Sequence, residues 1–201
     1  MAQTLAEAKK TLAQYAALAW QRGLAYGSGG NISQRWQEGL LISRSGASLR
    51  ALGEADILRV DKDCLALDAA AGCRPSIETA FHAAIYQARP EINAILHTHS
   101  TYATLFAVLG RRLPLPTLPA RLLLGQVSLV PPAEPGSSRL CALISQTLAG
   151  AGEHCPALLL AGHGAVAMGP DLEAAYNTAE LIEDTARTAW LLEQAGCQVK
   201  E

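Results

Sequence analysis

Apolar and polar residues follow two different spacings along the chain. Between residues 5 and 24 apolar side chains recur every three or four positions, which predicts an amphipathic helix. The same spacing predicts further helices over residues 76–88, 100–109, 137–149 and 171–195. Short apolar runs predict strands at 39–43, 57–60, 92–99 and, around a pair of glycines, within 157–168. Because helices and strands alternate, the pattern indicates an α/β fold.

Two stretches and the absence of internal division complete this outline. Several prolines lie among short apolar runs over residues 111–135, which predicts strands joined by ordered loops. Pro75 is expected to open the helix at 76–88, which places Glu78 in the first turn of that helix. Neither an internal repeat nor a low-complexity linker divides the sequence. Residues 1–201 are therefore predicted to form a single domain.

Composition excludes several classes of protein. Half of the 201 residues are hydrophobic and 17% are charged, which is enough for a sizeable core and incompatible with disorder. A net charge of -2 without a basic run argues against binding to nucleic acid. No apolar stretch reaches the roughly 20 residues of a membrane span, and the start MAQTLAEAKK has no signal-peptide core. Five cysteines without a CxxC spacing indicate reduced thiols, so we expect a cytoplasmic protein.

Three histidines form a candidate metal site. His97 and His99 close an apolar run that is predicted to be a strand, so their side chains point to the same face. His163 lies between Gly162 and Gly164 at another strand end, where a ligand can approach the backbone. Each residue alone also fits an unrelated loop histidine. Together they match three imidazole ligands with one open position, the arrangement of a catalytic divalent ion; Zn²⁺ is expected, with Mn²⁺ and Co²⁺ as alternatives.

Glu78 is the candidate acid–base group beside this site. A carboxylate next to a metal can move the proton of a polarised substrate, although a solvated glutamate at a helix start is the plainer interpretation. His82 follows four residues later on the same helical face, and we interpret it as a packed helix histidine rather than a metal ligand. His154, in a polar run, is interpreted as a surface loop residue.

A glycine-rich stretch over residues 26–33 has the chemistry of an anion cradle. Its glycines let backbone N–H groups converge, and Ser28 and Asn31 add side-chain donors. It has neither the lysine of a P-loop nor the GxGxxG spacing of a dinucleotide fold, and by itself it also fits a tight turn. A second small polar turn spans residues 43–48. Ser76, at the predicted start of a helix, is a third place for an anion.

Read in order, these segments resemble the class II aldolase/adducin family. The matching motifs extend over nearly the whole sequence: Ser28-Gly29-Gly30-Asn31-Ile32-Ser33, Ser45-Gly46, Pro75-Ser76-Ile77-Glu78, His97-Thr98-His99, Gly162-His163-Gly164 and the terminal stretch from Asp171 to Glu183. The resemblance implies a three-layer α/β/α sandwich with a mainly antiparallel central sheet. It also implies a homotetramer with active sites at subunit interfaces.

Within that family the sequence looks most like fuculose-phosphate-type aldolases, which cleave a ketose 1-phosphate into dihydroxyacetone phosphate and an aldehyde. The resemblance implies a metal-stabilised enediolate and a sugar phosphate as the substrate. It assigns the metal to His97, His99 and His163 and the acid–base role to Glu78. It assigns the phosphate to Ser28, Gly29, Asn31, Ser45, Gly46 and Ser76.

Two departures from the aldolase pattern leave other reactions open. Ile77 replaces a second serine, which removes one phosphate donor, and residues 111–135 contain no tyrosine where those aldolases carry a tyrosine acid. The same scaffold hosts methylthioribulose-1-phosphate dehydratases, decarboxylases of oxo-acid phosphates and sugar-phosphate 4-epimerases; the epimerases typically have Asp in place of Glu78. The adducin head, a non-catalytic interaction module, is the most remote alternative.

Overall fold

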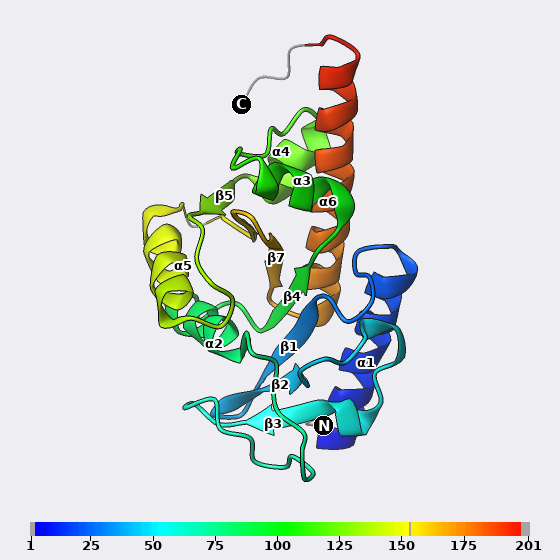
Figure 1. Cartoon of the computed structure of the whole chain (residues 1–201), viewed down its shortest axis with the longest axis vertical. Coiled ribbons are helices and arrows are strands. Elements are labelled where there is room, and N and C mark those ends of the chain that lie inside the picture. The colour runs from blue at the N-terminus through cyan, green and yellow to red at the C-terminus, as the bar shows by residue number, and fades with distance from the viewer. Residues whose placement is uncertain (1–2, 153, 198–201) are drawn as a thin grey trace.

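A seven-stranded sheet runs through the middle of the protein in the order β3-β2-β1-β4-β7-β6-β5 (Figure 1). The computed structural model describes residues 3–152 and 154–197, so residues 1–2, 153 and 198–201 of the predicted 1–201 domain lie outside the described residues. The strands are β1 (Asn31–Trp36), β2 (Gly39–Ser43), β3 (Ile57–Val60), β4 (Ala94–Thr98), β5 (Val127–Val130), β6 (Ala157–Leu160) and β7 (Gly164–Gly169). Neighbouring strands are antiparallel except β5 and β6, which are parallel.

Helices cover both faces of this sheet. They are α1 (Leu5–Gln21), α2 (Thr79–Ala88), α3 (Thr101–Val108), α4 (Leu118–Leu124), α5 (Ser138–Gly150) and α6 (Leu172–Gln194). One hydrophobic core joins the sheet to α1, α3, α4 and α6, and a second core joins the opposite face to α2 and α5. The predicted three-layer α/β/α sandwich with a mainly antiparallel sheet is therefore confirmed.

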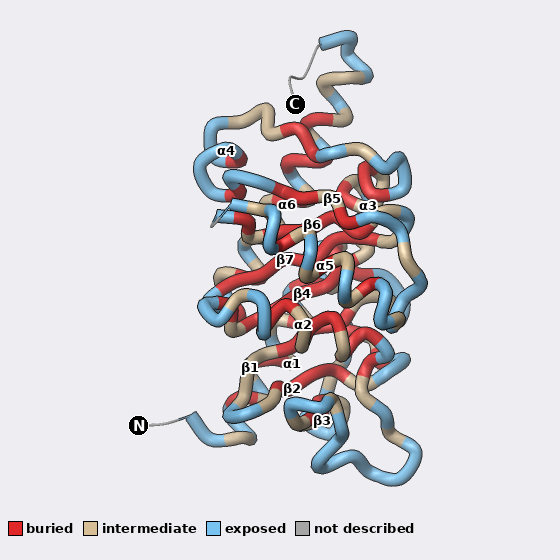
Figure 2. Tube along the Cα trace, turned by 90° about the vertical axis from the view of Figure 1, so that its left-hand side faces the viewer, coloured by how far each residue is buried: buried red, intermediate tan, exposed pale blue. Residues whose placement is uncertain are grey.

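The apolar run that ends in the histidine pair is explained by this layering. Ile95 of β4 packs into the core under α2 and α5, whereas Leu96 packs into the core under α1 and α6. Every residue of β4 is buried, and the strands form the buried interior of the protein (Figure 2). Because both faces are covered, the strand has no solvent side and shows no polar alternation.

The start of α2 corrects one prediction. The helix begins at Thr79, so Glu78 is the N-cap residue and Ser76 precedes the helix, instead of both lying in its first turn. The reason is that this segment first runs alongside the end of β2: the Ser76 N–H donates to the Ser43 carbonyl at 3.2 Å, and Arg44 pairs with Pro75. Ser76 therefore lies outside the first turn of α2, so the predicted anion site at a helix start does not apply to it.

Two further elements differ from the sequence prediction. Residues 111–135 contain the helix α4 as well as strand β5, because the Thr117 hydroxyl caps the Ala120 N–H at 3.2 Å and Pro119 occupies the first turn. The glycine-rich stretch continues directly into β1, a strand of largely polar residues that was not predicted. The other predicted helices and strands are confirmed to within a few residues.

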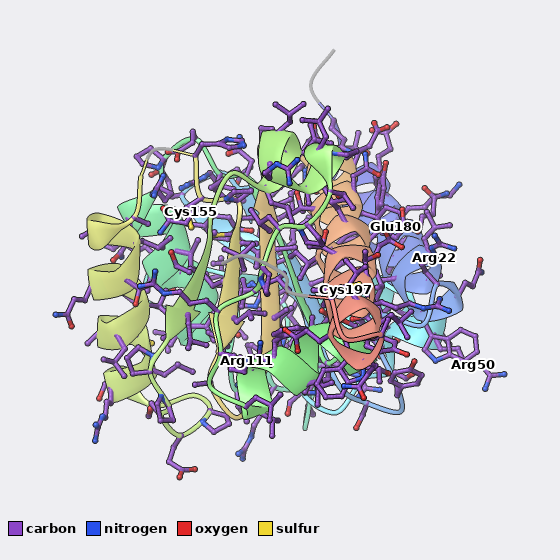
Figure 3. The ribbon with its side chains drawn as sticks, turned by 90° about the horizontal axis from the view of Figure 1, so that it is seen from above. Arg22, Arg50, Arg111, Cys155, Glu180 and Cys197 are labelled. Carbon is purple, nitrogen blue, oxygen red and sulfur yellow. The ribbon has the colours of Figure 1, made fainter. Side chains whose placement is uncertain are left out.

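All five cysteines are free thiols, and Figure 3 shows Cys197 beside α6 while Cys155 lies on the side of the sheet that α5 covers. An ion pair of 2.5 Å between Arg22 and Glu180 ties the end of α1 to α6 (Figure 3). Within the described ranges, no helix has the length and apolar character needed to cross a membrane.

Candidate metal and anion site

The middle of the sheet brings the candidate site together. β1 and β4 are neighbours, and their register places Asn31 opposite His97. On its other side β4 pairs with β7, where His97 lies opposite Val166. His163 occupies the turn between β6 and β7, and Glu78 caps α2 beside the same strands. Residues far apart in the sequence therefore meet at the seam between β1 and β4.

The three predicted metal ligands lie together. His97, His99 and His163 each offer a ligand atom, and these atoms lie within 4.8 Å of one another. Nε2 of His97 is 2.9 Å from Nε2 of His99. The carboxylate of Glu78 spans the group, with Oε2 at 3.3 Å from Nε2 of His97 and Oε1 at 3.4 Å from Nε2 of His163.

Burial keeps these imidazoles uncharged. Loss of solvation lowers the pKa of His97 to about 3 and that of His163 to about 4, and it lowers the pKa of His99 as well. The Ala165 carbonyl accepts a hydrogen bond of 2.9 Å from Nδ1 of His97, so the lone pair of that neutral ring is on Nε2 and points into the triad. Neutral imidazoles held this way by a backbone carbonyl are the form that binds a divalent ion.

Buried polar atoms without hydrogen-bond partners are a second indication of a bound divalent cation. Oε1 of Glu78 and Nδ1 of His163 are buried and find no hydrogen-bond partner in the described part of the chain. Buried polar atoms without partners are costly and need an explanation. Three neutral nitrogen donors beside one carboxylate fit a divalent cation with an open coordination position, the fit that the sequence predicted.

Two glycines make room for the rings. A side chain at position 164 would meet the Thr98 carbonyl at 2.5 Å and the ring of His99 at 2.8 Å. A side chain at position 29 would meet Nδ1 of His99 at 2.9 Å. These close approaches explain the glycine that follows His163 and the one at position 29, whereas Gly162 is explained by its positive φ of 74°.

All six residues predicted to bind phosphate line one hollow next to the triad. It has a volume of about 300 Å³ and also borders Glu78, His99 and His163. The six residues are Ser28, Gly29, Asn31, Ser45, Gly46 and Ser76. Arg44 lines the hollow too and was missed by the sequence reasoning, although it stands directly before Ser45; its guanidinium is paired with Asp56 at 2.5 Å.

The two remaining histidines differ in importance. His154 is exposed, as predicted, and contacts the Leu123 carbonyl at 3.0 Å. His82 is fully buried and stacks on Phe81, as predicted for a packed helix histidine. It is more than packing, however, because its ring contacts the side-chain amide of Asn31, which in turn holds Glu78. No signal in the sequence indicated this contact.

Metal-free protein is expected to lose stability as the pH falls from 6.5, the ordinary pKa of histidine, towards 4. In that window the histidines of the unfolded chain bind protons, whereas His97 and His163 of the folded chain stay neutral. The free energy of unfolding should therefore fall by about 1.4 kcal/mol per pH unit for each of them. Thermal melts across this range measure the effect.

A His163→Gln variant is the matched comparison for that experiment, since it lacks one of the two histidines. Its melting temperature should depend less steeply on pH over the same range. Equal slopes for the two proteins would contradict the assignment of the effect to this site.

Fold and site together define the class: an α/β/α protein with three histidines that could hold a metal ion beside a polar, glycine-lined hollow. The sequence pattern of the class II aldolase and adducin N-terminal domain matches residues 10–190. The chain belongs to this family, and the resemblance drawn from the motifs is confirmed.

Individual relatives include both a decarboxylase and aldolases. A 3-oxo-tetronate 4-phosphate decarboxylase from Pectobacterium atrosepticum is 36% identical over 190 residues, which cover 92% of this chain and 84% of the relative. An L-fuculose phosphate aldolase from Methanococcus vannielii is 34% identical over 170 residues, which cover 85% of this chain and 88% of the relative. Among solved structures, an L-fuculose 1-phosphate aldolase superposes with a TM-score of 0.88 at 29% identity, covering 100% of this chain and 92% of the other.

Proposed function

We propose that this protein is a metal-dependent lyase that breaks a carbon–carbon bond of a small sugar phosphate and leaves the enediolate of dihydroxyacetone phosphate. The main support is one juxtaposition: three neutral imidazoles, a carboxylate with a free oxygen and an anion hollow share a single site. Family membership and the names of the relatives agree with this reaction class.

The reactions named for the two kinds of relative pass through the same charged intermediate. In L-fuculose 1-phosphate the bond breaks beyond the hydroxylated carbon next to the ketone, and the bonding electron pair stays on that carbon. In 3-oxo-tetronate 4-phosphate the carboxylate leaves as carbon dioxide from the equivalent carbon. In both cases the electron pair is delocalised into the ketone, and protonation gives dihydroxyacetone phosphate. One site can therefore serve either reaction if it stabilises this charge and supplies a proton.

The hollow suits the phosphate end of such a substrate. Backbone N–H groups of the glycines and the hydroxyls of Ser28, Ser45 and Ser76 can donate hydrogen bonds to a phosphate, so no cationic side chain need be dedicated to it. Held there, the phosphate would place the ketone towards the triad, so that phosphate binding serves orientation. A divalent ion held by His97, His99 and His163 would polarise the ketone and stabilise the developing negative charge.

A second hollow gives room for the departing group. It has a volume of about 530 Å³, adjoins the first hollow at His163 and includes Ser137, Arg139 and Gly162 in its lining. His163 and Pro135 border both hollows. The substrate would thus extend from the phosphate hollow past the triad into this space.

Aldol cleavage is the first candidate reaction, because the motifs look most like those of fuculose-phosphate-type aldolases. Decarboxylation is the second candidate, and one observation favours it. Aldol cleavage must also remove a proton from the hydroxyl of the departing aldehyde, the step for which the aldolase pattern carries a tyrosine. Residues 111–135 contain none, and no tyrosine is found among the described residues that line the two hollows. Departing carbon dioxide needs no such group, so this observation favours decarboxylation.

A substrate comparison tests the proposal. Zinc-loaded protein is incubated separately with L-fuculose 1-phosphate and 3-oxo-tetronate 4-phosphate, and dihydroxyacetone phosphate, aldehyde and carbon dioxide are measured. Dihydroxyacetone phosphate with aldehyde identifies the aldolase, and dihydroxyacetone phosphate with carbon dioxide identifies the decarboxylase. The proposed carbon–carbon cleavage is wrong if neither substrate yields dihydroxyacetone phosphate and another reaction is found instead. Such a reaction would be dehydration of methylthioribulose 1-phosphate or epimerisation of a pentulose phosphate. An inert protein that binds no metal would indicate an adducin-like module.

We further propose Zn²⁺ as the resident ion, a cytoplasmic location and a homo-oligomer, with a tetramer as the expected size. The oligomer is supported by α4, which leaves Leu118, Leu122 and Leu123 between 59% and 67% exposed. Apolar side chains gathered on one short helix are typical of a surface that a partner covers. Metal analysis and light scattering of the purified protein test the ion and the subunit number.

A further inference from the structure

Five polar side chains form a buried line that ends at Glu78. We call this line the Glu78 network; it consists of Glu78, Asn31, His82, Ser33 and Tyr86. Asn31 Nδ2 donates to Oε2 of Glu78 at 2.7 Å, and the Asn31 Oδ1 atom lies 2.5 Å from Nε2 of His82. Nδ1 of His82 is 2.7 Å from the Ser33 hydroxyl, which is 2.8 Å from the Tyr86 hydroxyl. Each of the five residues is at least nine-tenths buried.

The direction of every hydrogen bond follows from the carboxylate end. Asn31 presents its NH₂ group to Oε2 of Glu78, which leaves the Asn31 carbonyl facing His82. A carbonyl only accepts, so His82 must carry its hydrogen on Nε2. Burial holds the pKa of His82 well below its usual value, so the ring is neutral and its Nδ1 accepts. The Ser33 hydroxyl therefore donates to Nδ1.

The other end of the line agrees with that direction. Ser33 uses its hydrogen towards His82, so it accepts from Tyr86. Burial raises the pKa of Tyr86, which keeps the phenol protonated and able to donate. Arg35 fixes this end, because its guanidinium donates to the Tyr86 carbonyl at 2.9 Å and lies 4.9 Å from the centre of the Tyr86 ring.

The two oxygens of Glu78 are therefore unequal. Oε2 accepts from Asn31 at the end of the network, whereas Oε1 is buried, has no hydrogen-bond partner among the described residues and faces Nε2 of His163 at 3.4 Å. We propose that the Glu78 network is a positioning device: Asn31, His82, Ser33 and Tyr86 hold Oε2 as an acceptor and leave Oε1 as the atom that exchanges a proton with the substrate carbon. This inference rests on the proposed function, in which Glu78 is the acid–base group.

The hydrogen bonds of the Glu78 network could also all run in the reverse direction. The two directions can be told apart without turnover, so the inference is testable on the resting protein. If Glu78 were protonated on Oε2 at rest, it would donate to Asn31, the amide would be reversed, and His82 would carry its hydrogen on Nδ1. The ring hydrogen of His82 thus reports the direction of the whole line.

Nitrogen-15 NMR of the histidine rings in zinc-loaded protein measures that hydrogen, with the His82 signals assigned by their loss in His82→Gln. The hydrogen is expected on Nε2, and a hydrogen on Nδ1 would overturn the inference. Because this readout needs no substrate, it decides the direction of the network even if the proposed reaction is wrong.

Proton exchange tests the positioning role itself. Dihydroxyacetone phosphate in deuterated water is the probe, since both proposed reactions end in protonation of its enediolate. His82→Leu, which removes both ring contacts, should slow exchange about tenfold or more, whereas His82→Gln, which keeps one N–H and one acceptor, should recover most of the rate. Tyr86→Phe should slow exchange about fivefold. In all three variants KM for the probe and the zinc content should stay unchanged.

Tyr15→Phe is the matched control for Tyr86→Phe, because Tyr15 lies on α1 against Tyr176, at a ring distance of 5.9 Å, and does not belong to the network. Circular dichroism and thermal melts check that each variant is folded, and Tyr86→Phe keeps the test available if His82→Leu does not fold. Wild-type exchange rates in folded His82→Leu or in Tyr86→Phe would overturn the positioning role. If the unmodified protein fails to exchange the probe, the proposed function fails, and the NMR result still stands for the network.

Discussion

His97→Ala is expected to lose the bound ion and, with it, all measurable lyase activity. His97 is the buried member of the triad, with its free lone pair directed at His99 and Glu78. Changes to groups that merely orient a metal ligand typically cost about 10- to 100-fold in metal affinity. Removal of a ligand itself should cost more, so zinc per chain after dialysis should fall close to zero while wild-type protein retains about one ion.

The control for this experiment is His154→Ala. His154 is also a histidine, but it is exposed and far from the triad, with its ring against the Leu123 carbonyl. This variant should keep its ion and its rate. Since His97 packs edge-on against Phe81, His97→Ala also creates a buried cavity, and His163→Gln on the exposed side of the triad provides a second ligand variant. Stoichiometric zinc in both ligand variants would show that the triad is not the metal site.

Glu78→Gln is expected to keep the ion and lose the chemistry. The substitution preserves the shape of the side chain but removes the oxygen that can exchange a proton. General acid–base groups typically contribute a factor of about 10² to 10⁴ to the rate. We therefore expect turnover and deuterium exchange into dihydroxyacetone phosphate to fall by at least about 100-fold, with zinc content and melting temperature close to those of the wild type.

Glu38→Gln is the companion variant for that measurement, since Glu38 is exposed at the turn between β1 and β2. It should turn over substrate at the normal rate. A Glu78→Gln protein that exchanges the probe at more than about a tenth of the wild-type rate would remove Glu78 from the acid–base role.

The parts of the site that the sequence predicts are those set by local geometry or by a motif. The side-chain period of a strand places His97 and His99 on one face wherever that strand lies. Their meeting with His163 and Glu78 is different, because it depends on the order of strands in the sheet. Spacing along the chain contains no information about that order, so only the combined pattern of motifs could bring the four residues together.

The Glu78 network lay beyond the reach of the sequence for the same reason. β1 carries polar residues such as Ser33 and Gln34 and lacks the alternation that marks a strand, so its pairing with β4 was not predicted. The contact between Asn31 and His82 exists only through that pairing and through the placement of α2. The missed helix α4 is a different kind of wrong prediction. Its signals, Thr117 and Pro119, are present in the sequence, but the surrounding prolines favoured strands and loops.

The seam between β1 and β4 has a consequence for the molecule as a whole. On one side stand β1 to β3 with the anion hollow, and on the other stand the strands that carry the histidines. A substrate with its phosphate on one side and its ketone on the other would act as a tether between an early and a late portion of the polypeptide. By mass action such a ligand favours the joined sheet over any state in which the portions separate. Substrate binding would thereby stabilise the pairing of β1 with β4, in addition to the packing and the ion pair by which α1 and α6 already join the two portions.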